Sequence, residues 1–144
     1  MFVMNEEMIN VAREFLKKSP FINFLGIELL ELTDTYAKGR MPFKTDYQNP
    51  YGTMHGGCLY ALADTVAGTV ANMSGKVVTT VEGNLHYLEP GWKTEYIYCE
   101  ATLIRSGKNL VTVNADIKDD NGKLLDCGYF TFFKTNMDLV SNKK

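Results

Sequence analysis

Apolar residues recur at helical spacing near the start of the chain and follow the spacing of strands over most of the remainder. In residues 5–18 they fall on one helical face, with Asn5 as the expected cap and Pro20 as the expected stop. Later segments combine alternation or β-branched and aromatic residues with flanking turn signals, which predicts strands. The six strands expected on this basis span residues 26–32, 35–43, 77–88, 95–105, 110–118 and 124–134.

Residues 58–72, between the second and third strands, are apolar on nearly every side. A helix that is hydrophobic all round belongs inside a core. Asp64 is its only charged residue. Burying a lone carboxylate is costly unless another group pairs with it or uses it. Asp64 is therefore a candidate functional residue.

Two strands, one buried helix and four strands joined mostly by tight turns predict an α+β fold with an antiparallel sheet. The buried helix is expected to cover one face of that sheet. We expect a single domain over residues 1–144, with its core at about 21–135. At the two ends of the chain, we expect a helix at 5–18 that packs on the sheet and a polar, frayed C-terminal tail at 137–144.

The start of the buried helix carries a second chemical signal. Gly56 and Gly57 precede it, and the first N–H groups of a helix have no intrahelical partner. Such groups stabilise negative charge that develops on a carbonyl oxygen. Asp64 lies seven residues after Gly57, about 10 Å further along the axis, so one helix cannot bring both to one reacting atom. Two antiparallel helices from two copies can, which predicts a dimer with two shared sites.

Composition narrows the function classes. The net charge is −2 with both signs interspersed, which argues against a nucleic-acid or anionic-membrane surface. Cys58, Cys99 and Cys127 are far apart and show no Cys-x-x-Cys spacing, as expected for a reducing cytoplasm. We expect a cytoplasmic protein with no secretory signal and no transmembrane helix.

Several short motifs follow one another in a fixed order along the chain. They are Asn49-Pro50-x-Gly52-x-x-His55-Gly56-Gly57 with Asp64 beyond it, Asn84-Leu85-His86-Tyr87-Leu88-x-Pro90, Arg105-Ser106-Gly107-Lys108, and Asp120-x-Gly122-Lys123-Leu124. Together they resemble a known family, the hotdog-fold acyl-CoA thioesterases of the phenylacetic-acid-pathway (PaaI-like) type. The resemblance covers roughly residues 21–134.

The resemblance implies a long helix wrapped by a curved antiparallel sheet, paired into dimers and often into tetramers. It implies hydrolysis of an acyl-CoA, with no metal and no cofactor other than the coenzyme A of the substrate. The Gly56 N–H would polarise the thioester carbonyl with help from Asn49, and the partner subunit's Asp64 would act as nucleophile or activate water. Thr80 would orient that water, and His55 would lie near the leaving thiolate. The remaining substrate-binding positions that the resemblance implies are Gly57, Tyr87, Arg105 and Lys108.

Two other functions stay open at this point. A hotdog dehydratase also uses a helix N-terminus and a carboxylate, but pairs that carboxylate with a histidine. A non-catalytic acyl-CoA-binding regulator can dispense with the carboxylate and carries an extra DNA-binding module. The chain has no Gly-x-Ser-x-Gly elbow, and its two histidines make a zinc site a poor fit. The acyl group, either aryl-acetyl or benzoyl type or medium-chain, is left undecided.

Overall fold

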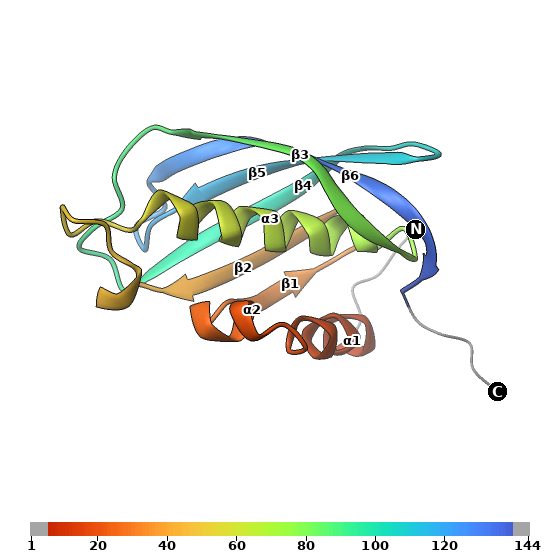
Figure 1. The fold of residues 1–144 in the computed structure, drawn as a ribbon, viewed down its shortest axis with the longest axis horizontal. Helices are drawn as coiled ribbons and strands as arrows, with labels where there is room; N and C mark the ends of the chain where they lie inside the picture. Colours follow the sequence, from red (N-terminus) through yellow and green to blue (C-terminus); the bar gives the residue numbers. More distant parts are fainter. Residues whose placement is uncertain (1–5, 140–144) are drawn as a thin grey trace.

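The computed structural model describes residues 6–139, whose strands form one antiparallel sheet in the order β1-β2-β4-β5-β6-β3 (Figure 1). The expected six strands are confirmed, each within a few residues of its expected bounds. Both ends of the sheet are edge strands, β1 on one side and β3 on the other. The strands are β1 (Glu28–Leu32), β2 (Tyr36–Pro42), β3 (Lys76–Tyr87), β4 (Tyr96–Ser106), β5 (Leu110–Lys118) and β6 (Leu124–Asp138).

The helix α3 (Gly56–Asn72) lies across the inner face of this curved sheet and contacts β2, β3, β4, β5 and β6 (Figure 1). Its mostly apolar sequence explains that position, since eight of its residues are buried. Gly39 on β2 lets the helix approach closely, because a side chain there would overlap Val66. The core is the layer between α3 and the sheet.

The N-terminal segment differs from the expectation of one helix over residues 5–18. Helix α1 (Glu6–Leu16) ends two residues earlier, and a second helix, α2 (Pro20–Leu25), follows at once. Pro20 begins a helix because proline tolerates the first helical position, and the Ser19 hydroxyl accepts the Ile22 N–H at 3.2 Å. The expected cap, Asn5, lies outside the described residues.

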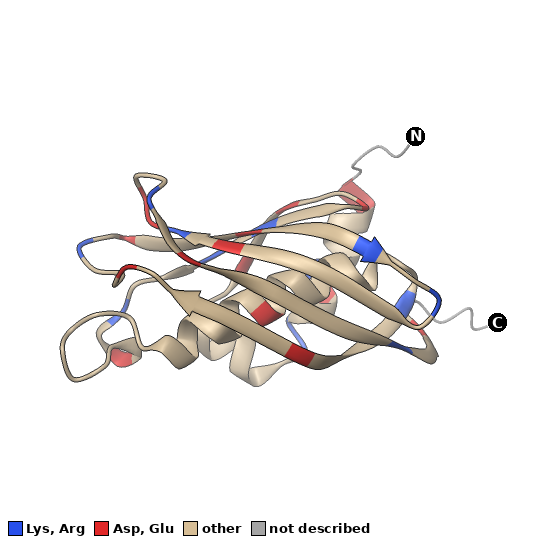
Figure 2. Cartoon of the chain, turned by 90° about the horizontal axis from the view of Figure 1, so that it is seen from above, with Lys and Arg blue, Asp and Glu red and all other residues tan. Residues whose placement is uncertain are grey.

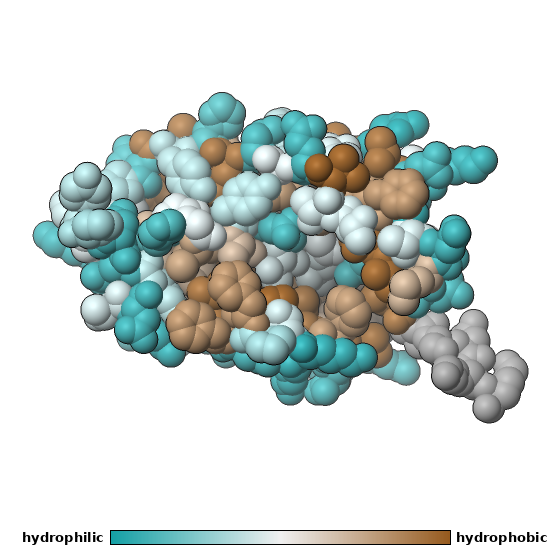
Figure 3. Space-filling model, in the orientation of Figure 1, coloured by the Kyte–Doolittle hydropathy of each residue, from teal (hydrophilic) through white to brown (hydrophobic). Residues whose placement is uncertain are grey.

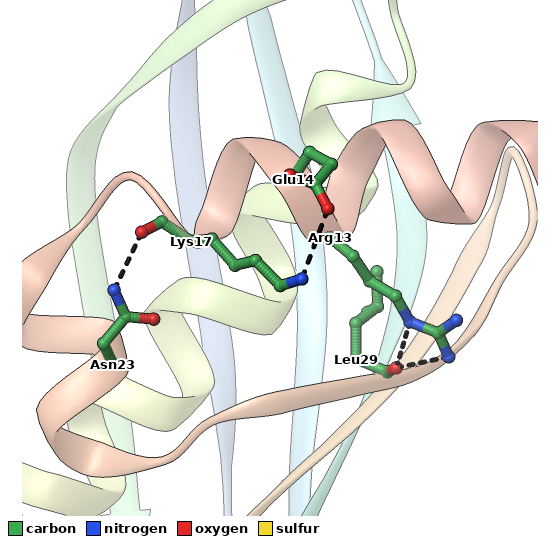
Figure 4. Close-up of polar contacts among 5 residues, drawn as sticks. All are labelled: Arg13, Glu14, Lys17, Asn23 and Leu29. Atoms are coloured by element: carbon green, nitrogen blue, oxygen red, sulfur yellow. Dashed lines mark hydrogen bonds and ion pairs between the residues drawn. The ribbon is translucent and has the colours of Figure 1, made fainter.

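Both short helices lie along the β1 edge of the sheet (Figure 1). Arg13 on α1 donates from Nε and Nη2 to the Leu29 carbonyl at 3.0 and 2.9 Å, and so occupies an acceptor of β1 (Figure 4). Hydrophobic side chains gather over this part of the surface (Figure 3), where Phe21 and Phe24 of α2 are exposed. Helix α1 therefore covers part of one sheet edge.

The C-terminal segment also differs from its expectation. The expected polar tail starts at Met137, but Met137 and Asp138 belong to β6. Lys76 at the start of β3 pairs with Asp138 at 2.7 Å, which ties this end of β6 to its neighbour. Residues 140–144 of the expected tail lie outside the described residues.

The other edge strand, β3, remains open in a single chain. It pairs only with β6, and most of its residues are exposed, including Val81 at its centre. Acidic and basic residues are interspersed over the rest of the molecule, as the sequence predicts (Figure 2). A long strand with one unpaired edge is a template for pairing with another strand.

Candidate active site

The loop before α3 is held in place by Asn49. Its Oδ1 accepts the backbone N–H groups of Tyr51 and Thr53 at 2.9 and 3.1 Å, and its Nδ2 donates to Thr53 Oγ1 at 2.7 Å. Gly52 takes a left-handed conformation at φ 87°, which a residue with a side chain rarely adopts. Asn49 therefore shapes the loop, and within residues 6–139 its second amide proton has no acceptor and is available to a ligand.

His55 caps the start of α3. Its Nδ1 accepts the Gly57 N–H at 2.8 Å, so in this arrangement Nδ1 carries no proton and Nε2 is the donor nitrogen. The His55 side chain is exposed, which leaves that donor available to a ligand. The N–H of Gly57 is therefore occupied by the hydrogen bond to His55.

The Gly56 N–H is the open donor at this helix end, since no hydrogen bond to it is found within residues 6–139. The Tyr87 hydroxyl from β3 donates to the Gly56 carbonyl oxygen at 2.8 Å and fixes the helix start against the strand. Beside it lies a hollow of about 250 Å³. Its lining includes Asn49, Gly56, Leu59, Tyr87 and Gly91.

Asp64 lies two turns further along α3 and is half-buried. Thr80 on β3 donates from Oγ1 to Asp64 Oδ1 at 2.8 Å. Burial raises the pKa of Asp64 above that of an ordinary aspartate, and the hydrogen bond from Thr80 opposes part of that increase. A carboxylate with raised proton affinity is a better general base near neutral pH.

A seam between α3 and β3 carries these groups in register. Gly56 meets Tyr87 and Asp64 meets Thr80, and between them the Tyr60 ring lies over Gly83, where a side chain would overlap the Tyr60 hydroxyl. Gly56 and Asp64 are eight positions apart, which corresponds to about 12 Å along the helix. One chain therefore presents two separate half-sites, an N–H donor at one end of the seam and a carboxylate at the other.

Arg105 and Lys108 lie far from Gly56 in the same chain. They flank the turn between β4 and β5, and this turn contacts Lys134, whose Nζ donates to the Gly107 carbonyl at 2.6 Å. Lys134 pairs with Val78 near the start of β3, two residues from Thr80. The turn that carries these basic residues therefore lies toward the end of the sheet where β3 starts, whereas Gly56 contacts Tyr87 at the other end of β3.

Asp126 on β6 was not singled out by the sequence analysis, yet it is fully buried. Neither of its carboxyl oxygens has a hydrogen-bond partner within the described chain. The alternation along the last strand contained the signal, because Asp126 shares a face with Phe130 and Phe132, both core residues. The contact of Thr53 with Asn49 was not predicted either, and no pattern in the sequence around Thr53 indicates it.

Residues 6–139 hold no group of three or more His, Cys, Asp or Glu side chains that could bind a metal ion. None of the helices in that range is long and apolar enough to cross a membrane.

Comparison with known proteins identifies the class of protein. The model of the Thioesterase superfamily matches residues 51–125, slightly more than half of the chain. This match includes α3, the open Gly56 N–H and the Asp64–Thr80 pair. The chain belongs to the Thioesterase superfamily and is an enzyme of the hydrolase class.

Individual relatives agree with this assignment. The chain is 26% identical over 132 residues to acyl-coenzyme A thioesterase 13 of Homo sapiens, covering 89% of this chain and 94% of the relative. It is 25% identical over 133 residues to a protein of Archaeoglobus fulgidus described as a putative esterase, covering 92% and 86%. The solved structure of Escherichia coli PaaI, from the phenylacetic acid degradation operon, superposes with a TM-score of 0.87 at 18% identity, covering 94% and 99%. The expected hotdog fold is confirmed.

Proposed function

We propose that the chain hydrolyses an acyl-CoA thioester to a free acid and coenzyme A, at sites shared between two copies. The observation that carries this proposal is the open Gly56 N–H at the start of a long helix, with Asp64 and Thr80 two turns away on the same seam. Coenzyme A esters are the substrate class because two of the relatives are named acyl-coenzyme A thioesterases.

In the proposed reaction the thioester carbonyl oxygen accepts the Gly56 N–H. The carbonyl oxygen becomes negatively charged in the tetrahedral intermediate, and a preorganised donor at a helix N-terminus stabilises that charge. The Tyr87–Gly56 hydrogen bond supports this role, since it fixes the position of the donor. Asn49 assists by holding the loop and can offer its remaining amide proton to the same oxygen.

The partner subunit's Asp64 attacks the carbonyl carbon or takes a proton from the water that attacks it. Thr80 from the same subunit as that Asp64 holds the carboxylate in place and can orient the water. The carbon–sulfur bond then breaks. Where water attacks, this step releases the acid, and the proton that Asp64 took from the water passes to the thiolate. Where Asp64 attacks, a water then hydrolyses the acyl–Asp64 anhydride, which releases the acid and supplies the proton for the thiolate. The exposed Nε2–H of His55, beside the helix start, can donate a hydrogen bond that stabilises the leaving thiolate.

Pairing of two copies would bring the half-sites together. The unpaired β3 edge supports an antiparallel arrangement, because a twofold axis at β3 would extend the sheet and set the two α3 helices against each other. Arg105 and Lys108 would then contact the nucleotide of the coenzyme A whose thioester meets the Asp64 of their own chain. Gly57 and Tyr87 would line the path of the pantetheine arm.

Contacts at Asp64 favour hydrolysis over dehydration. A hotdog dehydratase pairs its carboxylate with a histidine, whereas the side-chain hydrogen bond of Asp64 comes from Thr80. The Nδ1 atom of His55 accepts a hydrogen bond at the start of its own helix. A non-catalytic regulator would bind acyl-CoA without turning it over, so an activity measurement distinguishes it from a hydrolase.

The test is thiol release from a panel of acyl-CoA esters by wild type and by Asp64→Asn. The panel pairs phenylacetyl and benzoyl esters with medium-chain esters, and the signal of Cys58, Cys99 and Cys127 is subtracted. Asparagine keeps the shape of the side chain and an acceptor for Thr80 but cannot act as a base. We expect turnover of at least one ester and about a hundredfold or greater loss in Asp64→Asn.

Equal circular dichroism spectra and melting curves of the two proteins serve as the folding control. Binding of acyl-CoA by wild type without thiol release from any ester would overturn the hydrolase proposal and favour a regulator. Turnover that Asp64→Asn retains would overturn the role of Asp64.

A further inference from the structure

Asp126 is a buried carboxyl group that the proposed reaction does not use. Its exposed fraction is 0%, and both carboxyl oxygens lack a hydrogen-bond partner among residues 6–139. Ionising a buried carboxyl group that has no partner is costly, so burial favours the neutral form of Asp126. Burial raises its pKa from 3.8 to about 7, and no nearby cation offsets the increase.

The position of Asp126 connects it to the start of α3. Asp126 pairs in register with Tyr87 on β3, so the two side chains lie next to each other on the same face of the sheet. The Tyr87 hydroxyl in turn donates to the Gly56 carbonyl. Burial raises the pKa of Tyr87, and a negative charge at its neighbour Asp126 raises it further.

The titratable groups around Asp126 leave its charge uncompensated. Tyr87 faces it from β3 and Cys99 from β4, and both are neutral side chains with raised pKa values. Its register partner on β5 is the apolar Ile117. The titratable side chains of α3 have other neighbours: Cys58 lies near Tyr47, Tyr60 over Gly83 and Asp64 against Thr80.

We propose that Asp126 is a positioning residue for the Gly56 half-site and that it supports catalysis only while it is neutral. An ionised Asp126 places a negative charge behind Tyr87 and the helix start, where it opposes the second negative charge that develops on the substrate oxygen. The inference rests on the proposed function. It predicts a bell-shaped pH profile, in which Asp64 must be ionised and Asp126 neutral.

The test compares the pH profile of kcat/KM in wild type and Asp126→Asn. Wild-type kcat/KM should fall about tenfold between pH 6 and pH 9, with a midpoint near the pKa of about 7. Asp126→Asn cannot ionise, so its alkaline decrease should disappear while the acid side stays in place. Asp116→Asn is the matched control, because it removes a half-buried carboxylate on β5 and should keep the wild-type profile.

A second readout does not depend on turnover. Because the folded pKa of Asp126 lies above its unfolded value, the free energy of unfolding should fall as pH rises from about 4 to about 7. Asp126→Asn should lack this component of the decrease. If the asparagine variant fails to fold, Asp126→Ala and direct titration of the Asp126 carboxyl in wild type by NMR replace it.

The outcomes separate the two proposals. Active wild type whose alkaline decrease persists in folded Asp126→Asn or Asp126→Ala overturns the inference and leaves the hydrolase function intact. So does an Asp126 carboxyl that titrates below pH 5. Wild type that releases no thiol at any pH overturns the proposed function and this inference with it.

Discussion

Asp64 and Thr80 together set the protonation behaviour on which the proposed reaction depends. Asp64 is half-buried on α3, and this burial raises its pKa, while the 2.8 Å hydrogen bond from Thr80 lowers it. The two effects have opposite sign because burial disfavours the charged form and a donated hydrogen bond favours it. A base must be ionised to act, so activity should fall as pH decreases through this raised pKa.

Thr80→Val tests this balance at the scale of one hydroxyl group. Valine keeps the branched shape but removes the donor, so the pKa of Asp64 should rise further and the acid limb of kcat/KM should move to higher pH. At pH 6 we expect a loss of about tenfold or more, with a smaller loss at pH 8. Thr80→Ser retains a hydroxyl and should keep the wild-type limb. An unchanged limb in Thr80→Val would show that this hydrogen bond does not tune Asp64.

At the scale of elements, the seam between α3 and β3 fixes both half-sites on one rigid unit. Tyr60 packs edge-on against Phe130 with ring centroids 5.1 Å apart, and its hydroxyl occupies the space above Gly83. Gly128 on β6 lies equally close to the backbone of β3, where a side chain would overlap Asn84. These glycines let the helix, the edge strand and β6 approach one another closely.

Two glycine substitutions should have opposite effects on stability. Gly83→Ala forces Tyr60 and Phe130 to move, so we expect a loss of about 1–3 kcal/mol in the free energy of unfolding. Gly68→Ala, inside α3, places its new methyl group at an ordinary 3.5 Å from Phe132 and should stabilise the protein by about 0.5–1 kcal/mol. Denaturant unfolding of both variants beside wild type measures the difference. A Gly83→Ala variant as stable as wild type would mean that the seam is loosely packed.

The elements differ in how far their sequence predicts them. The apolar pattern of residues 58–72 and the turn signals between the strands are local, so the central helix and all six strands could be predicted. Pro20 was misinterpreted because proline both ends and begins helices, and the choice depends on the Ser19 cap and on packing at β1. The roles of Gly83 and Gly128 depend on contacts between distant segments, which no local pattern encodes.

The candidate site was predictable for a similar reason, and only in part. Gly56 and Asp64 stand out by residue type and spacing, and His55 by the family resemblance. The contacts of Tyr87 with Gly56 and of Thr80 with Asp64, by contrast, join different elements. Asp126 was overlooked although its strand alternation placed it on the core face. The functional roles of these residues are predictions. They are based on the separation of the two half-sites in one chain, which calls for a site shared between two chains.

At the scale of the whole molecule, the proposed active site needs groups from two chains. The Gly56 N–H and Asp64 are separated by about 12 Å of helix, and the β3 edge is unpaired. A variant that removes only the N–H donor is available, because proline tolerates the first position of a helix and His55 already has the extended backbone (φ −61°, ψ 134°) that proline requires before it. Gly56→Ala brings a comparable Cβ close to the Tyr87 ring, at 3.3 Å, but retains the N–H, and is its matched control.

The most direct measurement is activity after subunit exchange between Gly56→Pro and Asp64→Asn. Each variant alone should lose about a hundredfold or more, while Gly56→Ala stays within several-fold of wild type. In a mixed dimer one site combines the intact Gly56 of one chain with the intact Asp64 of the other, and the second site lacks both. Random exchange makes about half of the dimers mixed, so an equal mixture should recover about a quarter of wild-type activity. A mixture that forms mixed dimers and stays as inactive as its components would contradict shared sites.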